Sequence, residues 1–147
     1  MKFFLIFFTL FFLSNCGTKY PFCVEESNRK LEIAWGTIFS KQKDKVEKFL
    51  LISTGDIFKI EHPQKRKKIL KIDNDKYCFV LQNVTETILK TQAINEIGDT
   101  LNFVEYYNPK LGIYFIAKWH PRFKTKNSIY FRQLYDSLQA LTFGIKN

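Results

Sequence analysis

The chain has 147 residues, of which 46% are hydrophobic and 17% aromatic, and its formal net charge is +9. This length suits one folded domain with a real core and is too short for two comfortable domains. The positive charge favours acidic partners such as anionic lipid or acidic glycan, although a lysine-rich solvated surface gives the same balance.

A short apolar segment opens the chain. Met1 and Lys2 precede the run from Phe3 to Leu13, which is apolar except for one threonine. In a helix this run rises only about 16 Å, whereas a bilayer core is about 30 Å thick. We therefore interpret residues 1–15 as a signal peptide and not as a membrane span. No later apolar run approaches the length of a span.

The sequence Leu13-Ser14-Asn15-Cys16 closes this segment. It resembles the lipobox of bacterial lipoproteins, in which the cysteine thiol receives a diacylglycerol and the preceding peptide is removed. Leu13, Ser14 and Cys16 match the pattern, whereas Asn15 stands where a smaller residue is usual. The resemblance implies an acylated, palmitate-bearing Cys16 and a protein anchored in the bacterial cell envelope. Gly17 replaces the Asp that retains many such proteins in the inner membrane, which favours the outer membrane. The alternative is an ordinary secretory signal that ends in a cysteine by chance.

Two further cysteines, Cys23 and Cys78, remain after Cys16. In an oxidising compartment such a pair can form a disulfide, which would stabilise the fold by about 4 kcal/mol. The alternative is a pair of free cysteines, because buried free cysteine is common. Cys23 lies in the predicted lipidated N-terminus and tether, residues 16–30, and Cys78 lies in a predicted helix.

The first half of the domain contains strand patterns. Alternating apolar residues or β-branched runs predict strands at 31–39, 49–53, 57–61 and 68–72. Gly55 at the first central position predicts a type II′ hairpin turn between the second and third of these. Residues 40–48 and 64–68 are predicted to be charged connections, and Pro63 after His62 ends a strand because it lacks a ladder donor.

The second half alternates helix and hairpin. Tyr77, Leu81, Val84 and Ile88 share one helical face after the N-cap choices at residues 73–75. Two strands, 100–107 and 112–120, are predicted to form a hairpin central to the sheet and partly covered by a helix, since both of their faces are rather apolar. After it, Asn127 or Ser128 can cap a final helix whose apolar stripe is Phe131, Leu134, Tyr135, Leu138 and Leu141.

The resulting order is β-ββ-β-α-ββ-α. It predicts a single α+β domain over residues 31–147, with an antiparallel β-sheet of about five to six strands and two helices packed on one face. The layout resembles small uncharacterised bacterial lipoprotein domains over about 110 residues, without a signature motif.

Catalytic and metal-binding motifs are not found. His62 and His120 each precede a proline at a strand end, and neither has a Cys, Asp or Glu at metal-ligand spacing. A phosphate-binding glycine loop and a Gly-x-Ser-x-Gly motif are also missing from the sequence. We therefore expect no enzyme, no cofactor and no metal site.

Two stretches could bind a partner. The basic run Lys65, Arg66, Lys67 and Lys68, with Lys71, is a candidate patch for an anionic partner. In residues 118–126, Trp119 and Phe123 alternate with cations that could stack on sugars or bases. The alternatives are a solvated charged face for the first stretch and closure of the core for the second. The envelope compartment argues against nucleic acid.

From sequence alone we expect a lipid-anchored cell-envelope protein with a small non-catalytic binding or structural domain. Its partners would be the membrane and an envelope or extracellular protein. The alternative is a surface-displayed adhesin-like or inhibitor-like module that binds a protein or acidic glycan.

Overall fold

The computed structural model describes residues 19–41, 45–61 and 65–143. The predicted signal peptide, the lipobox with Cys16 and the predicted strand end at His62-Pro63 lie outside these described residues.

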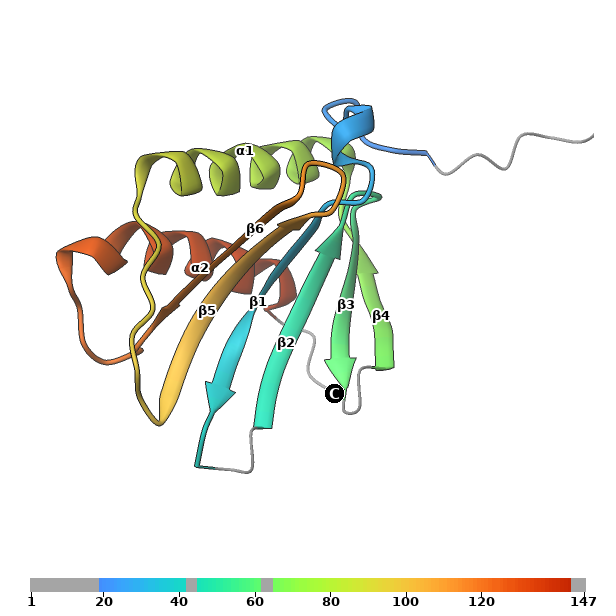
Figure 1. Ribbon diagram of the computed structural model, residues 1–147. Helices are drawn as coiled ribbons and strands as arrows, with labels where there is room; N and C mark the ends of the chain where they lie inside the picture. The colour runs from blue at the N-terminus through green and yellow to red at the C-terminus, as the bar shows by residue number, and fades with distance from the viewer. Residues whose placement is uncertain (1–18, 42–44, 62–64, 144–147) are drawn as a thin grey trace, which may run out of the picture.

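The described residues form one antiparallel sheet with two helices on one face, which confirms the predicted α+β fold (Figure 1). The strand order is β4-β3-β2-β1-β5-β6. The strands are β1 (Glu32–Phe39), β2 (Lys45–Ile52), β3 (Asp56–Glu61), β4 (Lys65–Lys71), β5 (Thr100–Asn108) and β6 (Ile113–Trp119). The helices are α1 (Asn74–Lys90) and α2 (Ile129–Thr142), and two 3-10 turns, η1 (Glu26–Asn28) and η2 (Lys126–Ser128), accompany them.

Both helices form where their apolar stripes predicted them. Asp73 caps α1 by accepting a hydrogen bond from the Lys76 amide at 2.8 Å, as Asp residues do at helix starts. Tyr77, Leu81 and Val84 of α1 are buried against the sheet, and so are four members of the α2 stripe: Phe131, Leu134, Tyr135 and Leu138. These side chains build the main core with Trp35, Trp119 and Val104 from the strands.

Two charged segments predicted as connections are parts of strands. β2 begins at Lys45 and β4 begins at Lys65, so the basic run is not a loop. A strand is held by backbone hydrogen bonds, which lysine side chains do not prevent, and lysine is common on edge strands because it discourages pairing with another sheet. β4 is such an edge strand.

Two predictions about the hairpins are also wrong. The Ile52 carbonyl accepts from the Gly55 amide, so Ser53 and Thr54 are the central turn residues and Gly55 follows them with φ +83°. A glycine in this conformation after the turn is typical of a three-residue hairpin loop. The β5–β6 hairpin lies at the sheet edge and not at its centre, because β1 pairs with β5 and leaves β6 outermost.

A disulfide joins Cys23 to Cys78, with their Cα atoms 5.7 Å apart. It ties the segment before β1 to the second turn of α1. Asn28 reinforces this attachment by accepting a hydrogen bond from Asn108 at 2.9 Å. The folded domain therefore includes residues 23–30, which the sequence assigned to the tether.

Gly36 lets β1 approach β2 unusually closely. A Cβ atom placed on Gly36 would lie 1.7 Å from the carbonyl oxygen of Glu47, which is part of the backbone and cannot rotate away. Glycine in a strand interior marks such close backbone approaches and bends in a sheet. The sheet thus requires the absence of a side chain at this one position of its central strand.

We predict that Gly36→Ala destabilises the protein by about 3 kcal/mol, because the added methyl must force β1 and β2 apart. Chemical unfolding monitored by tryptophan fluorescence would measure the change. The control is Gly98→Ala, where the nearest atom is the movable His120 side chain at 3.2 Å. Equal stability of the two variants would contradict this role of Gly36.

Candidate binding surface on the open face of the sheet

The face of the sheet opposite the helices carries its own apolar cluster, which we call the open face. Ala34, Leu50 and Phe103 are buried there although no described element lies over them. Partly buried apolar residues surround these three, namely Ile38, Ile52, Phe58, Ile60 and Ile116. An apolar surface of this kind, rimmed by charges, is typical of an interaction site.

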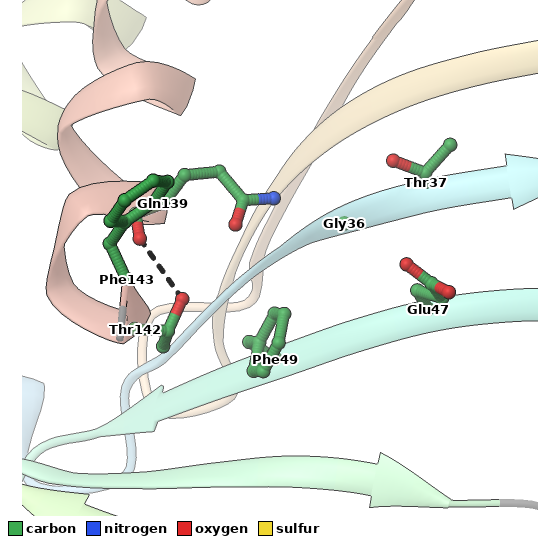
Figure 2. Close-up of a pocket in the computed structure, with 7 residues that line it drawn as sticks. All are labelled: Gly36, Thr37, Glu47, Phe49, Gln139, Thr142 and Phe143. Carbon is green, nitrogen blue, oxygen red and sulfur yellow. Dashed lines mark hydrogen bonds between the residues drawn. The ribbon is translucent and has the colours of Figure 1, made fainter. Parts of the chain in front are cut away.

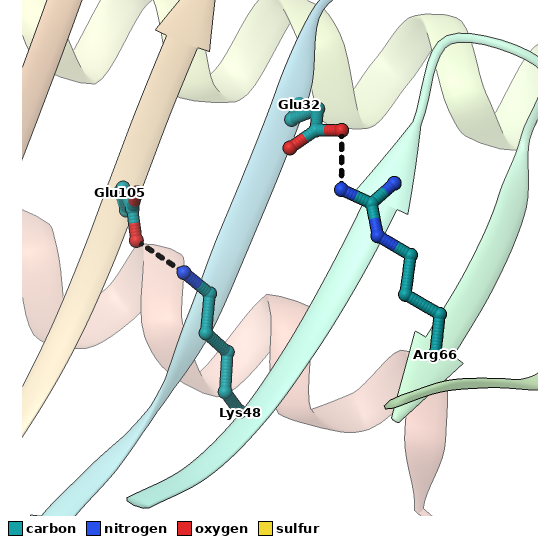
Figure 3. A network of polar contacts seen from close by, with 4 residues as sticks. All are labelled: Glu32, Lys48, Arg66 and Glu105. Carbon is teal, nitrogen blue, oxygen red and sulfur yellow. Dashed lines mark hydrogen bonds and ion pairs between the residues drawn. The ribbon is translucent and has the colours of Figure 1, made fainter. Parts of the chain in front are cut away.

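An ion pair crosses β1 above Ala34 and Gly36, the two smallest residues of this strand. Lys48 on β2 and Glu105 on β5 flank β1, and their Nζ and Oε2 atoms are 2.7 Å apart (Figure 3). In the register, Lys48 faces Gly36 and Glu105 faces Ala34. The lysine can reach across because neither residue of β1 raises a bulky side chain between them. Both charged groups are partly buried.

A second ion pair joins two strands that are not neighbours in the sheet. Arg66 on β4 donates to Glu32 on β1 at 2.9 Å, although β3 and β2 lie between these strands (Figure 3). Three strand intervals in a flat sheet would separate the two backbones by about 14 Å. Because arginine and glutamate side chains are both long, the pair can bridge this distance above β2 and β3 and so lies over the open face.

A third ion pair lies at the same side of the face. The Nζ of Lys68 lies 2.6 Å from Oδ1 of Asp56, and Thr54 donates to Oδ2 at 2.7 Å. Partial burial opposes ionisation of Asp56, but the hydrogen bonds from Lys68 and Thr54 and the charges of Lys68 and Lys71 hold its pKa below 3.8. Asp56 therefore stays charged on the open face at neutral pH.

These contacts define what the open face can do chemically. It presents an apolar floor beside fixed charges that already have partners, so it is suited to contact another apolar surface and to orient it by charge. Tyr107 and Tyr114 extend the face at one end, with ring centroids 6.2 Å apart in an edge-to-face arrangement. Desolvation, and secondarily the charge of Glu105, raises the pKa of Tyr114 and keeps its hydroxyl protonated.

The predicted basic patch is divided by the geometry of β4. Arg66 and Lys68 point toward the open face, where both are paired with carboxylates. Alternation along the strand directs Lys65 and Lys67 to the opposite side, where Lys67 is the register partner of Lys59. The basic residues 65–68 therefore do not form one patch. Lys59, Lys65 and Lys67 lie together on the side of the sheet opposite the ion pairs of Arg66 and Lys68.

A pocket of about 360 Å³ lies on the helix side, between β1, β2 and the end of α2 (Figure 2). It is lined by Gly36, Thr37, Glu47, Phe49, Gln139, Thr142 and Phe143. Behind it runs a chain of hydrogen bonds in which Gln139 donates to Tyr135, Tyr135 contacts Thr37, and Thr37 donates to Asn102. The Thr37 hydroxyl thus donates to an amide oxygen, which is not a general base. These hydrogen bonds order the wall of the pocket, but they do not activate Thr37 as a nucleophile.

The stretch 118–126 is organised by Arg132. Its guanidinium donates to the carbonyls of His120, Pro121 and Phe123 and so holds this loop on α2. Trp119 is buried against Phe131 and Tyr135 and closes the core. Phe123 is exposed and packs on the His120 ring, whose Nδ1 accepts from the Arg122 amide at 3.2 Å. His120 is thereby a structural residue of this loop.

No family model and no curated protein sequence matches this chain. Within residues 19–41, 45–61 and 65–143, no helix is long and apolar enough to cross a membrane. Among the same residues, His, Cys, Asp and Glu side chains form no group of three or more that could hold a metal ion.

Sequence patterns did not identify the open face. Its signal is that β1, β2 and β3 have apolar residues on both sides, as in Ile57-Phe58 and Leu50-Leu51. Such runs predict a strand covered on both faces. The helices cover one face only, and the apolar residues left on the other are the floor of the candidate surface.

We predict that the ion pair of Asp56 makes stability depend on pH. Its pKa is lower in the folded protein than in the unfolded chain, so the pair stabilises the fold above pH 3.8 and this contribution is lost as the pH falls through the folded pKa. Asp56→Asn should therefore lower the free energy of unfolding at pH 6, and the difference from wild type should shrink as the pH falls through the folded pKa.

Urea unfolding across this pH range would measure the difference. Asp136→Asn, at an exposed carboxylate of α2, is the matched control and should leave the pH profile close to that of wild type. A deficit of Asp56→Asn that stays constant with pH would contradict the assignment.

Proposed function

We propose that this protein is a lipid-anchored component of the bacterial cell envelope whose domain acts by binding and not by catalysis. The proposed anchor is Cys16, at the end of the predicted signal peptide. The proposed binding surface is the open face.

The Cys23–Cys78 disulfide is the observation that carries the proposal. Disulfides persist in oxidising compartments outside the cytoplasm, so a bridged pair supports export of the chain. The pair also accounts for two of the three cysteines in the sequence and leaves Cys16 for acylation. Export and a remaining cysteine at the signal border are both needed for lipid attachment at a lipobox.

The open face supports a role in binding. Its apolar floor is covered by no described element, and three ion pairs fix the charges around it. A partner that covers Phe58, Ile60 and Ile116 would remove apolar surface from water, which drives association. This proposed role needs no cofactor and no metal.

Expression in a bacterium that processes lipoproteins would test the anchor. Wild type should incorporate radiolabelled palmitate and lose residues 1–15, as intact mass would show. Cys16→Ala should lose both the label and the cleavage before residue 16, because the thiol is the site of acylation and the processing enzyme requires it.

Cys23→Ala with Cys78→Ala is the matched control, since it removes two cysteines but retains Cys16. This double variant should keep the palmitate label. A wild-type protein that is secreted without label would reject the lipid anchor.

A surface-displayed module that binds a protein or acidic glycan is the second candidate function. It is favoured by the position of the Lys59, Lys65 and Lys67 cluster, because β4 runs from Lys65 to Lys71 toward the end of the domain from which the N-terminal segment leaves (Figure 1). Lys65 is about 20 Å farther along the strand than Lys71. Charges so far from an anchoring membrane lie beyond the screening length of about 8 Å at physiological salt, so they remain free to bind an acidic partner away from the membrane.

Protease treatment of whole cells distinguishes the two candidates. A surface-displayed domain should be degraded by added protease in intact cells, whereas a domain facing the periplasm should be degraded only after the outer membrane is opened. A periplasmic protein of known location serves as the integrity control. Complete protection in intact cells would reject surface display.

A further inference from the structure

One end of the domain gathers exposed apolar side chains next to the route toward Cys16. We call this end, made by residues 19–28 and 108–114, the anchor end. Phe22 is 78% exposed, Leu111 is 53% exposed and Tyr114 is 59% exposed. Figure 1 shows the chain leaving toward its N-terminus beside the turn between β5 and β6.

Contacts hold the two parts of the anchor end together. Lys110 pairs with Glu26 at 3.3 Å, and Asn108 donates to Asn28 at 2.9 Å. The Asn108 side chain also accepts from the amides of Lys110 and Leu111, which fixes the turn. The exposed residues therefore project from a rigid base and not from a free tail.

The chain between Cys16 and the domain is very short. The disulfide at Cys23 fixes one point, and the Tyr20 ring packs on the Arg29 guanidinium, 5.6 Å from the ring centroid. Four residue steps separate Cys16 from Tyr20 and span at most about 14 Å. An acyl group on Cys16 would hold the anchor end within this distance of the lipid headgroups.

The side chains exposed there suit the headgroup region. Tyrosine is enriched at membrane interfaces because its ring is apolar and its hydroxyl is polar. Phenylalanine and leucine gain by leaving water when they reach the acyl chains. Lys19, Arg29 and Lys30 are exposed beside them and would attract anionic headgroups.

We infer that the anchor end is a docking surface for the phospholipid bilayer, with Phe22, Leu111 and Tyr114 inserted at the interface. The inference rests on the proposed lipid attachment at Cys16. It adds that the domain is held in one orientation on the membrane, with Lys65 and Phe123 at the end that faces away.

Quenching of an added tryptophan by brominated phospholipid tests this orientation. The full lipidated chain carrying Phe22→Trp is reconstituted into liposomes that contain the brominated lipid. Trp35 and Trp119 are completely buried, so they provide a constant background. The tryptophan at residue 22 should lose emission and shift to shorter wavelength, because it enters the interface.

Phe123→Trp is the matched control. Phe123 is 67% exposed, similar to Phe22, but it follows β6 at the opposite end of the domain. Its emission should be the same with brominated and ordinary lipid. Adding Leu111→Asp to Phe22→Trp should reduce the quenching, because a charge would enter the interface with the turn.

Flotation of the liposomes separates the failure of docking from the failure of the anchor. A protein that floats with the liposomes while residue 22 is unquenched keeps its anchor and overturns the docking surface. Equal quenching at residues 22 and 123 overturns the single orientation. A full chain that carries no acyl group and does not float rejects the proposed lipid anchor, and the docking inference with it.

Discussion

The shape of this domain depends on the absence of a side chain at Gly36. The central strand β1 approaches the Glu47 carbonyl so closely there that no Cβ could be accommodated. Gly36 and Ala34 place no bulky side chain above β1, so the Lys48 side chain can cross the strand and pair with Glu105. The ion pair between Lys48 and Glu105 therefore depends on the same small residues of β1 that allow the close approach of β1 and β2.

Local sequence patterns predicted helices and strands well where the burial of side chains determines the secondary structure. The stripes from Tyr77 to Val84 and from Phe131 to Leu138 specify both helices because burial repeats with the helical period. The lysine-rich starts of β2 and β4 were missed because backbone pairing, and not side-chain pattern, makes them strands. The order of strands was beyond local patterns, since β1 pairs with β5 across more than sixty residues of chain. Placing the β5–β6 hairpin at the edge required that non-local contact.

The candidate surface also has features that local sequence patterns predict and features that depend on the strand order. The basic run at Lys65 was visible in the sequence, but the alternation of β4 sends Arg66 and Lys68 to the open face, where carboxylates pair with them. The apolar floor could not be anticipated, because it combines residues of five strands whose neighbours are set by topology. The Cys23–Cys78 bridge was one of two alternatives in the sequence, and only the fold brings the segment before β1 against α1.

The ion pairs limit what the open face can bind. Lys48 and Glu105 are already partly buried, so a partner that covers them removes the remaining water at a cost in solvation. Apolar contact with Phe58, Ile60 and Ile116 beside the pair offsets that cost, because these side chains are still partly exposed. A partner with its own apolar ridge therefore fits this face better than a highly charged polymer does. A polyanion would find its counter-charges at Lys59, Lys65 and Lys67, on the other side of the same hairpin.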